Sequence, residues 1–598
     1  MNVADYILDF LVKKKVRHVF LMTGGAISFV VDAFSRNKKI SYTCVAHEQA
    51  AAMMADSYSR VGHNFSATMV TSGPGATNLL TGIACSWFDS IPTIHICGQV
   101  NSHELSNAHK STKKVRQVGF QETDIVSMAR PITKFSYQLK NEKDIRFALE
   151  KAYYTAQSGR PGPVLIDIPM GLQRKKINPS KLKSFKPNKQ VILKKSTINE
   201  IQKIKNFLTK SKRPSIVVGG GVRYSKTTKA LLAFVKNLNI PIVTTWSGVD
   251  SIDHDYKNYI GCIGVYGSRA ANFVIQNSDF VLCLGSRLDT RVTGGIPKNF
   301  ARGAFIAAVD IDKNELNKKR GLNIDIKINI DLSIFFKLFK KYIKNLHVDK
   351  MDWTQQALEW KIKYPTVLQS FRNQKKYVNP YAFMEQLSEI LKDDEIVIGD
   401  TGAHLTWAIQ ALKIRRQQRL FSAFGNSPMG YAFPASLGAS IALKKKRIIC
   451  IVGDGSIQVN IQELHTMVAN KLPVKIFAMN NNGYGIIKQF QKLYLSKRYE
   501  ASGKGFSNPD FKKICKGFKV SYSEIRKNGD IEAIIKKALV SKKPEFINVF
   551  VKPDQQIIPK LSFGDPIEDQ SPKIPRKDFY RNMLTKPISN NKKIIESN

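Results

Sequence analysis

One carboxylate and one amide side chain offer the most specific chemistry in this chain. Asp454 lies between Gly453 and Gly455, and Asn481 follows it by 27 residues. Both side chains carry hard oxygen donors of the kind that bind Mg²⁺ or Ca²⁺. The flanking glycines leave room for a phosphate to approach backbone N–H groups. Mg²⁺ takes few protein ligands and completes its octahedron with phosphate oxygens, so the pair predicts a diphosphate bound through Mg²⁺.

The segments around this pair predict how it is positioned. Apolar runs at 448–452 and 474–479 are typical of buried parallel strands. Between them, apolar residues recur at helical spacing from about Asn460. Asp454 and Asn481 are therefore expected at the carboxyl ends of two successive strands, where open parallel sheets bind ligands. Taken alone, the glycine–aspartate turn is equally typical of a helix cap without a ligand.

This combination resembles the motif of thiamine diphosphate-dependent enzymes, in which Gly-Asp-Gly and an Asn-Asn pair stand this far apart. The Asn-Asn pair here is Asn480-Asn481. The resemblance implies that Mg²⁺ is held by Asp454, Asn481 and the backbone carbonyl of Gly483. It also implies that a glutamate from a separate domain completes the site.

A glutamate near the N-terminus meets that requirement. Glu48 follows His47 and lies in an alanine-rich stretch that reads as a helix from about Val45. A carboxylate at the start of an apolar helix needs a partner, and such surroundings suit proton exchange near neutrality. The resemblance implies that Glu48 hydrogen-bonds the aminopyrimidine ring of the cofactor and acts as general acid and base. The alternative is an acid favoured by the helix dipole, and for His47 a packing or hydrogen-bonding role is as well supported as a catalytic one.

The resemblance covers about residues 1–555 and is closest to the large subunit of acetolactate (acetohydroxyacid) synthase. The stretches that carry it are Gly24-Gly25-Ala26-Ile27, His47-Glu48-Gln49, Ser72-Gly73-Pro74-Gly75-Ala76-Thr77-Asn78, Gly119-Phe120-Gln121-Glu122, Arg291-Val292-Thr293-Gly294 and Met429-Gly430-Tyr431.

Further site residues follow from the resemblance. Gly25, Phe120 and Gln121 would shape the substrate pocket, and Met429 would support the bent cofactor from below, with core packing as its alternative role. The residues expected to bind thiamine diphosphate lie in loops that read as strand–helix turns, which are common without any ligand. They are Ser72, Gly73, Pro74, Asn78, Gly402, His404, Gly430, Gly453, Gly455, Ser456 and Gly485.

Glycine turns in the central part of the chain indicate a second cofactor. Glycines at 219–221 and at 285 follow apolar strands and can cradle a pyrophosphate. The resemblance implies FAD without a redox role in the main reaction, although many thiamine enzymes keep this domain and bind no flavin. The residues expected to bind it are Arg160, Gly219, Gly220, Arg287, Arg291 and Asp310.

Departures from the family pattern keep the acceptor substrate open. Phe490 stands where a Trp is usual, and Ala403 where a Gln is usual. Met22-Thr23 replaces Tyr-Pro, and Thr290 replaces an Asp. The expected enzyme decarboxylates pyruvate and transfers the two-carbon unit to a second carbonyl, as in branched-chain amino-acid biosynthesis. The alternative acceptor is a keto-sugar nucleotide in polysaccharide biosynthesis.

The chain length of 598 residues predicts about three domains. Strands alternating with amphipathic helices indicate an α/β protein with three doubly wound parallel sheets. We expect a pyrimidine-binding domain at 1–175, a central FAD-type domain at 196–340, a diphosphate-binding domain at 368–555 and an extended C-terminal tail at 556–598. The first and third domains are expected to share a fold.

Composition bounds the remaining classes. A net charge of +46 suggests nucleic-acid binding, but the lysines are spread along the chain without a binding motif, so this class is disfavoured. Seven dispersed cysteines without zinc-site spacing indicate reduced thiols in a cytoplasmic protein. No apolar run reaches the roughly 18 residues of a membrane-spanning helix.

Assembly is expected from the placement of the two halves of the site. Glu48 and Asp454 fall in different domains, and the family pairs these residues across subunits. We therefore expect a homodimer or homotetramer with the active site at the subunit interface. A regulatory small subunit is compatible with the resemblance and cannot be read from this chain.

Overall fold

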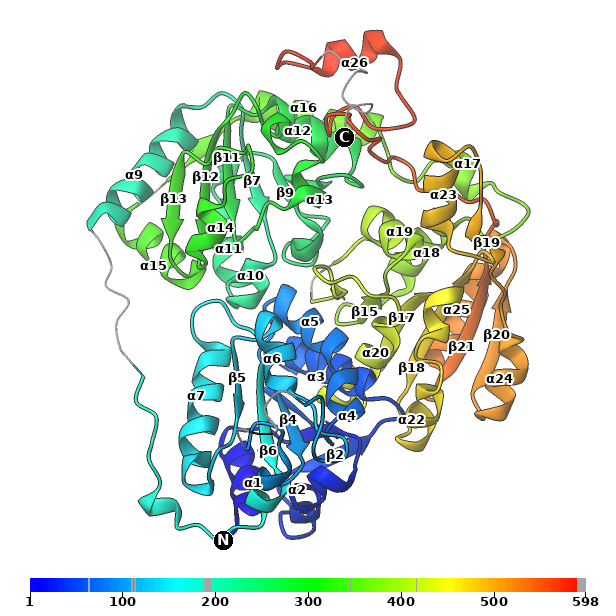
Figure 1. Ribbon diagram of the computed structural model, residues 1–598. Coiled ribbons are helices and arrows are strands. Elements are labelled where there is room, and N and C mark those ends of the chain that lie inside the picture. The colour runs from blue at the N-terminus through cyan, green and yellow to red at the C-terminus, as the bar shows by residue number, and fades with distance from the viewer. Residues whose placement is uncertain are drawn as a thin grey trace.

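The structure, a computed structural model, describes residues 1–62, 65–108, 111, 115–187, 195–343, 346–415 and 417–588. Figure 1 shows three α/β units, coloured blue to cyan, green, and yellow to orange along the chain. Each unit is built on a six-stranded sheet in which every strand pair of the described residues is parallel. The expected fold class is confirmed.

The N-terminal unit has the strand order β2-β1-β3-β4-β6-β5. Its central strands β3 and β4 are buried along their whole length, as expected of strands covered by helices on both faces. Its strands are β1 (His18–Leu21), β2 (Ser41–Cys44), β3 (Ser66–Val70), β4 (Thr93–Gln99), β5 (Phe135–Gln138) and β6 (Val164–Pro169). Its helices are α1 (Val3–Lys13), α2 (Ser28–Asp32), α3 (Glu48–Gly62), α4 (Pro74–Asn78), α5 (Leu80–Phe88), α6 (Ile125–Ala129), α7 (Ile145–Gln157) and α8 (Met170–Gln173).

The central unit has a different order, β10-β9-β7-β11-β12-β13. Its strands are β7 (Pro214–Val218), β9 (Ile242–Thr244), β10 (Tyr259–Cys262), β11 (Phe280–Leu284), β12 (Phe305–Asp310) and β13 (Ile326–Asn329), and β8 (Leu238–Asn239) pairs separately with β14 (Val348–Asp349). Its helices are α9 (Lys195–Lys210), α10 (Gly221–Tyr224), α11 (Thr228–Val235), α12 (Arg269–Asn277), α13 (Thr290–Thr293), α14 (Lys313–Asn317), α15 (Leu332–Tyr342) and α16 (Met351–Lys363).

The C-terminal unit repeats the N-terminal arrangement with the order β16-β15-β17-β18-β21-β20. Its strands are β15 (Ile396–Gly399), β16 (Arg419–Phe421), β17 (Ile448–Gly453), β18 (Val474–Asn480), β20 (Ser521–Ile525) and β21 (Glu545–Phe550), and β19 (Glu500–Gly505) lies outside this sheet. Its helices are α17 (Gln369–Arg372), α18 (Pro380–Ile390), α19 (Ala403–Ala411), α20 (Ala432–Ala442), α21 (Asp454–Gln458), α22 (Glu463–Ala469), α23 (Gly485–Tyr494), α24 (Phe511–Gly517) and α25 (Ile531–Val540).

Two differences from the expected elements concern the loop at Asp454. The helix expected from about Asn460 begins at Glu463, and Asp454 itself begins the short helix α21. The five residues of α21 have no apolar repeat from which a helix could be expected. The turn after β17 is therefore a helix start, with Asp454 in its first turn.

The N- and C-terminal units pack directly on each other through α3 and α20 (Figure 1). The Ser57 hydroxyl donates to the Ala435 carbonyl at 2.6 Å. A Cβ atom at Gly438 would lie 2.2 Å from the Met54 carbonyl oxygen, so glycine is required for this close approach. A continuous apolar core spans both helices, which makes the interface part of the fold.

The C-terminal segment was expected to be extended, and the structure adds a helix, α26 (Arg576–Asn582). This segment packs on the central unit, where the Asn272 side chain donates to the Ile567 carbonyl at 2.8 Å and Phe579 is buried. The helix is short and Lys- and Arg-rich, so its stability comes from this packing rather than from a sequence pattern. Residues 589–598 lie outside the described part of the chain.

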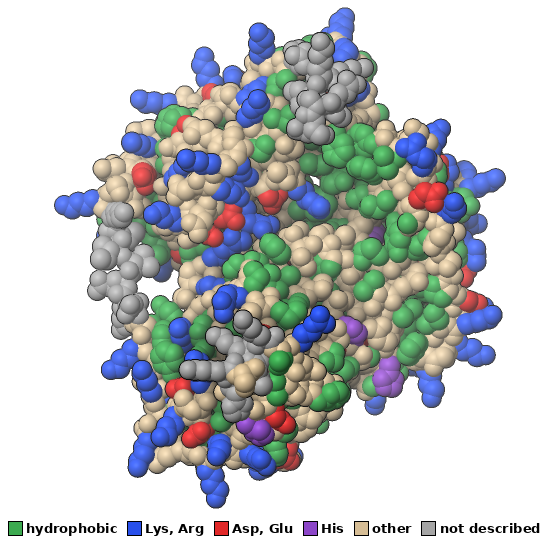
Figure 2. All heavy atoms as spheres, viewed as in Figure 1, with side chains coloured by type: hydrophobic (Ala, Val, Ile, Leu, Met, Phe, Trp, Pro, Cys, Tyr) green, Lys and Arg blue, Asp and Glu red, His purple; other side chains and the backbone are tan. Residues whose placement is uncertain are grey.

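Three further observations concern the charged side chains, the helices and the cysteines. Figure 2 shows Lys and Arg side chains spread around this face rather than gathered in one patch. Across the described ranges, no helix has both the length and the apolar character needed to cross a bilayer. All seven cysteines are free thiols, and only Cys44 is exposed.

Candidate active site

The expected metal ligand Asp454 follows β17 directly and is buried, with only 2 % of its surface exposed. Its Oδ1 accepts a hydrogen bond from the Gly455 N–H at 3.0 Å. Its Oδ2 accepts from the Gly483 N–H at 3.2 Å and from the Asn508 side chain at 2.8 Å. Burial raises the pKa of this carboxyl, and a cation bound beside it would favour the charged form.

The second expected ligand, Asn481, follows β18 at the same edge of the sheet. Gly453 at the end of β17 pairs in register with Met479 of β18, so the two strand ends are neighbours. The Asn481 side chain is buried, and its Nδ2 has no hydrogen-bond partner within the described residues. Asn482 adopts a left-handed conformation with φ of 51°, which makes this a sharp turn.

This donor set fits a magnesium–diphosphate pair. A carboxylate, an amide and a backbone carbonyl supply hard oxygen donors to Mg²⁺. The unpartnered Asn481 Nδ2 is a buried N–H donor, and a diphosphate oxygen would satisfy it. No cluster of three or more His, Cys, Asp or Glu side chains able to hold a metal occurs in the described residues. A metal ion at Asp454 would therefore need further oxygen donors from a bound molecule. A diphosphate supplies such oxygens to Mg²⁺.

The loops around Asp454 pack closely on one another and form a glycine-rich cradle. His404, in the first turn of α19, packs closely on Gly402 and Gly453. A Cβ atom would lie 2.5 Å from the His404 ring at Gly402 and 2.9 Å from it at Gly453. Burial lowers the pKa of His404 to about 3, so the ring is neutral at physiological pH. The hydroxyl of Ser456 donates to the Thr401 carbonyl at 3.2 Å, which joins the two loops.

One residue missed from the sequence, Asp400, fixes the segment that carries Met429. Its carboxylate accepts hydrogen bonds from the backbone N–H groups of Gly430 at 3.1 Å and Ala432 at 3.0 Å. It is fully buried, and burial raises its pKa to about 7. Asp400 follows β15 after a glycine, the same pattern as Asp454 after β17, and this repetition is the signal that could have identified it.

The N-terminal unit assembles the second group around Glu48. This residue begins α3, is 6 % exposed, and accepts a hydrogen bond from the Asn78 side chain at 2.9 Å. The expected loop from Ser72 to Asn78 therefore does reach Glu48. Gly73 has a φ of 59° and lies against Gln121, whose carbonyl oxygen would be 2.9 Å from a Cβ at that position. His47 accepts a hydrogen bond from the Gln49 N–H through its Nδ1 at 3.1 Å, which supports a hydrogen-bonding role for it.

Two of the expected substrate-side residues of the N-terminal unit, Gly25 and Phe120, are uncovered. No heavy atom lies within 4 Å of the Cβ position of Gly25. Phe120 is 85 % exposed, and its neighbour Gln121 has a φ of 66°. Glu48 makes no hydrogen bond or ion pair with Asp454, Asn481 or Gly483 within the described part of the chain. In one chain, therefore, Gly25 and Phe120 are uncovered and Glu48 is not bonded to the expected metal ligands.

The central unit holds a cavity of about 400 Å³ against the N-terminal unit. Glycine loops after β7 and β11 line one part of it, and the segment Phe88–Ser90 with Arg160 lines another. Of the expected flavin ligands, Arg160, Gly220, Arg287 and Asp310 line this cavity. Its size is in the range of cofactor pockets, and backbone N–H groups at the glycine loops suit a pyrophosphate.

Two expected flavin ligands lie outside this cavity. A Cβ at Gly219 would lie 2.2 Å from the Gly285 carbonyl, so this glycine serves loop-to-loop packing. Arg291 lies over the Trp246 ring at 4.5 Å and lines a second cavity of about 330 Å³ with Phe490 and Lys560. The Trp-to-Phe departure therefore faces a cavity that also holds two cationic side chains.

The segment after the metal site contacts the C-terminal tail. The Gln489 side chain accepts from the Ile557 N–H and donates to the Ile557 carbonyl, both at 2.9 Å, so both ends of its amide are paired with the tail. The Lys488 ammonium donates to the Asn482 carbonyl at 2.8 Å, beside the expected metal ligands.

Comparison with known proteins agrees with this architecture. Family models of the thiamine pyrophosphate enzymes match residues 1–128 as the N-terminal thiamine pyrophosphate-binding domain, 201–336 as the central domain and 400–549 as the C-terminal thiamine pyrophosphate-binding domain. The chain is 34 % identical over 571 residues to an acetolactate synthase large subunit of Cyanidium caldarium, covering 94 % of this chain and 95 % of that protein. It is 31 % identical over 568 residues to the acetolactate synthase isozyme 2 large subunit of Escherichia coli, covering 94 % and 98 %. The protein therefore belongs to the thiamine pyrophosphate enzymes, in the family of the acetolactate synthase large subunits.

Proposed function

We propose that this chain is the catalytic subunit of a thiamine diphosphate- and Mg²⁺-dependent carboligase of the acetolactate synthase type. It decarboxylates pyruvate and transfers the two-carbon unit to a second 2-keto acid, in branched-chain amino-acid biosynthesis. The observation that carries the proposal is the convergence of Asp454, Asn481 and Gly483 at one sheet edge, with an unpartnered Asn481 N–H donor and closely packed glycine loops beside them.

The residues of the C-terminal unit hold the cofactor in this proposal. Asp454, Asn481 and the Gly483 carbonyl would hold Mg²⁺, which would supply positive charge to the diphosphate. The diphosphate lies against the cradle, and Met429 supports the ring portion because Asp400 fixes the backbone on its C-terminal side. The residues proposed to contact the cofactor in this unit are Gly402, His404, Met429, Gly430, Gly453, Gly455, Ser456 and Gly485.

The residues of the N-terminal unit supply the proton chemistry. When bound, thiamine diphosphate provides the electron sink for loss of CO₂ from a 2-keto acid. Glu48 would exchange a proton with the bound cofactor, and the Asn78 amide donates to its carboxylate at 2.9 Å and orients it. Ser72, Gly73 and Pro74 bring the backbone close to the ring, and Gly25, Phe120 and Gln121 shape the substrate pocket.

A second copy of the chain completes the site in this proposal. Phe120 is 85 % exposed and Gly25 faces open space, so both lack the cover that a closed pocket would give them. We infer a homodimer or homotetramer in which Glu48 of one subunit meets Asp454 of another. The names of the relatives also support a partner small subunit.

FAD is proposed for the cavity of about 400 Å³, with Arg160, Gly220, Arg287 and Asp310 as its contacts. Arg291 is proposed instead for the acceptor side, where it and Lys560 offer cations to a substrate carboxylate. The buried free cysteines support a reducing cytoplasm as the site of action.

The experiment combines the purified chain with thiamine diphosphate, Mg²⁺ and pyruvate and identifies the products by mass. Acetolactate with one CO₂ per product is expected. CO₂ without acetolactate would reject pyruvate as acceptor, and adding keto-sugar nucleotides would then test the alternative acceptor. No cofactor binding in calorimetry would overturn the proposed function.

A further inference from the structure

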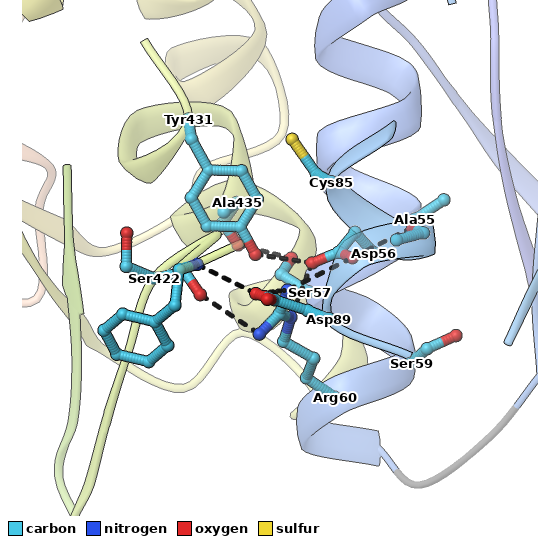
Figure 3. A network of polar contacts seen from close by, with 12 residues as sticks. Ala55, Asp56, Ser57, Ser59, Arg60, Cys85, Asp89, Ser422, Tyr431 and Ala435 are labelled. Atoms are coloured by element: carbon cyan, nitrogen blue, oxygen red, sulfur yellow. Dashed lines mark hydrogen bonds and ion pairs between the residues drawn. The ribbon is translucent and has the colours of Figure 1, made fainter. Parts of the chain in front are cut away.

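A buried network of charges joins the N- and C-terminal units (Figure 3). Arg60 on α3 donates to Asp56 at 2.6 Å and to Asp89 at 2.8 Å. All three side chains are at least 94 % buried, because their exposed fractions are 6 %, 0 % and 4 %. Isolated buried charges are costly, so groups of this kind persist only when paired and hydrogen-bonded.

The network holds the segment 422–432, which carries Met429, at its N-terminal end. The Arg60 guanidinium donates to the Ser422 carbonyl at 3.1 Å (Figure 3). The Asp89 carboxylate accepts from the backbone N–H groups of Phe424 at 2.9 Å and Gly425 at 2.8 Å. A Cβ at Gly425 would lie 2.5 Å from the Phe88 Cβ, so the two segments are in close contact.

The same network holds the segment just after Met429. The Tyr431 hydroxyl donates to Asp56 at 2.5 Å, and its ring is fully buried (Figure 3). Met429 thus lies between backbone groups fixed by Asp89 and a side chain fixed by Asp56. Its position depends on residues of the N-terminal unit as well as on Asp400.

The opposite side of Asp89 belongs to the central cavity. Phe88, Asp89 and Ser90 line the cavity of about 400 Å³. Two proposed flavin ligands contact this short segment: Arg287 donates to the Phe88 carbonyl at 3.1 Å, and Arg160 donates to the Ser90 hydroxyl at 2.8 Å. A ligand that binds these arginines therefore affects the position of Phe88–Ser90. The Asp89 side chain of this segment in turn holds the backbone at 424–425.

We propose that Phe88–Ser90 and the Asp56–Arg60–Asp89 network couple the central cavity to the segment that carries Met429. When a flavin dinucleotide occupies this cavity, the network positions Met429, and the affinity of the protein for thiamine diphosphate rises. The link makes Asp89 and Arg60 positioning residues. The inference rests on the proposed function, and it gives the flavin a task that needs no electron transfer. By thermodynamic reciprocity, thiamine diphosphate raises the affinity for the flavin by the same factor.

The test measures this coupling directly in the full-length protein after removal of bound flavin. Calorimetric titration with thiamine diphosphate in Mg²⁺ is done without FAD and with saturating FAD, and the coupling is the ratio of the two dissociation constants. A coupling of about tenfold is expected, within the usual range for linked sites. Titration in the reverse order must give the same factor.

Three variants locate the coupling. Asp89→Asn keeps the side-chain volume but replaces one of the two carboxylate oxygens that accept from backbone N–H groups by an NH₂ donor. The coupling in this variant is expected to fall to about one. Tyr431→Phe removes only the hydroxyl that donates to Asp56, and its coupling is expected to fall about threefold. Ser333→Ala is the matched control, because Ser333 lines the same cavity and makes no described contact with Phe88–Ser90, so its coupling is expected to stay near tenfold.

The outcomes separate this inference from the proposed function. Wild-type protein that binds both cofactors with a coupling of one overturns the link and leaves the carboligase proposal standing. No binding of either cofactor overturns the proposed function. If Asp89→Asn does not fold, as judged by thermal unfolding, the Tyr431→Phe and Ser333→Ala pair decides, and equal coupling in both rejects the link.

Discussion

The N- and C-terminal units share one strand order but place different chemistry at the same position of the sheet. In both, the first and third strands of the unit are neighbours, and the chain leaves them in opposite directions. Ligands bind at such switch points in open parallel sheets. The N-terminal switch point, between β1 and β3, is lined by the small residues Gly24, Gly25 and Gly73, whereas the C-terminal one, between β15 and β17, carries Asp400 and Asp454.

The difference teaches that topology provides the position and the loops provide the function. The central unit has another strand order, yet its glycine loops after β7 and β11 also meet at its switch point. Fold alone therefore does not separate a pyrimidine site from a diphosphate site or a flavin site. The residues in the loops do, and substitutions in matching loops should have different consequences.

The largest effect is expected from removing the carboxylate of the C-terminal switch point. Asp454→Ala deletes the one charged group of the proposed Mg²⁺ site, and cofactor binding should weaken at least ~100-fold with acetolactate formation falling at least ~1000-fold, since the diphosphate loses its bridge. Calorimetry with and without Mg²⁺ measures the first effect. Asp554→Ala, an exposed aspartate of the same unit, is the control and should behave as wild type. Retained Mg²⁺-dependent binding in the first variant would contradict the ligand assignment.

The matching substitution in the N-terminal unit should separate binding from turnover. Glu48→Gln keeps the size of the side chain and can still bond Asn78, so cofactor affinity should change less than about threefold. Turnover should fall by roughly 100- to 10,000-fold, the usual contribution of a general acid–base group. Steady-state rates and calorimetry on the same preparation make the measurement. A parallel loss of affinity and rate would instead assign Glu48 a purely structural role.

Sequence patterns predicted the strands and the turns after them because both depend on neighbouring residues. The apolar runs at 448–452 and 474–479 correspond to β17 and β18, and their ends place Asp454 and Asn481 at neighbouring positions. The short helix α21 was not expected because it has no hydrophobic repeat. Asp400 was overlooked, although its glycine–aspartate pattern repeats that of Asp454.

Contacts between distant segments could not be predicted from a single sequence. Asp56 and Arg60 are one helical turn apart and were visible as a possible pair, but Asp89 and Tyr431 come from other elements. Likewise, nothing in the residues around Gln489 indicates that its amide pairs with Ile557 of the tail. Such contacts depend on tertiary packing, which pattern and propensity do not encode.

A smaller effect should distinguish how the two matching sheets respond to acid. The fourth strand of the N-terminal unit buries His95 between the hydroxyls of Thr68 and Thr93, each at 2.9 Å, and burial lowers the pKa of His95 to about 3. In the C-terminal unit, the buried Lys475 of the fourth strand lies 3.6 Å from Glu545 instead.

Acid therefore acts on His95 through the unfolded state. Its folded pKa lies below the unfolded value of 6.5, so the unfolded chain binds more protons between these values and stability falls as the pH drops below 6.5. At a pH of about 4.5 the loss from this residue should be roughly 3 kcal/mol. His95→Gln can keep both hydroxyl contacts and removes the titration. Urea unfolding between about pH 7 and 4.5 should show the variant losing less stability than wild type, and parallel pH profiles would exclude His95 as a source of acid lability.

The smallest effect concerns two adjacent glycines of the N-terminal switch point. A Cβ at Gly24 would lie 2.6 Å from the Thr71 Cβ, so Gly24→Ala should cost about 1–3 kcal/mol of unfolding free energy through overpacking. No heavy atom lies within 4 Å of the Cβ position of Gly25, so Gly25→Ala should change stability by less than about 0.5 kcal/mol. If the keto acid occupies the space at Gly25, Gly25→Ala should also raise the KM for pyruvate several-fold and change kcat little. Denaturant unfolding and steady-state kinetics on the pair make the measurement, and an unaltered KM would mean that the space at Gly25 is not used by the substrate. A raised KM in the Gly25 variant and a loss of stability in the Gly24 variant would show that glycine is needed at Gly25 for substrate binding and at Gly24 for packing.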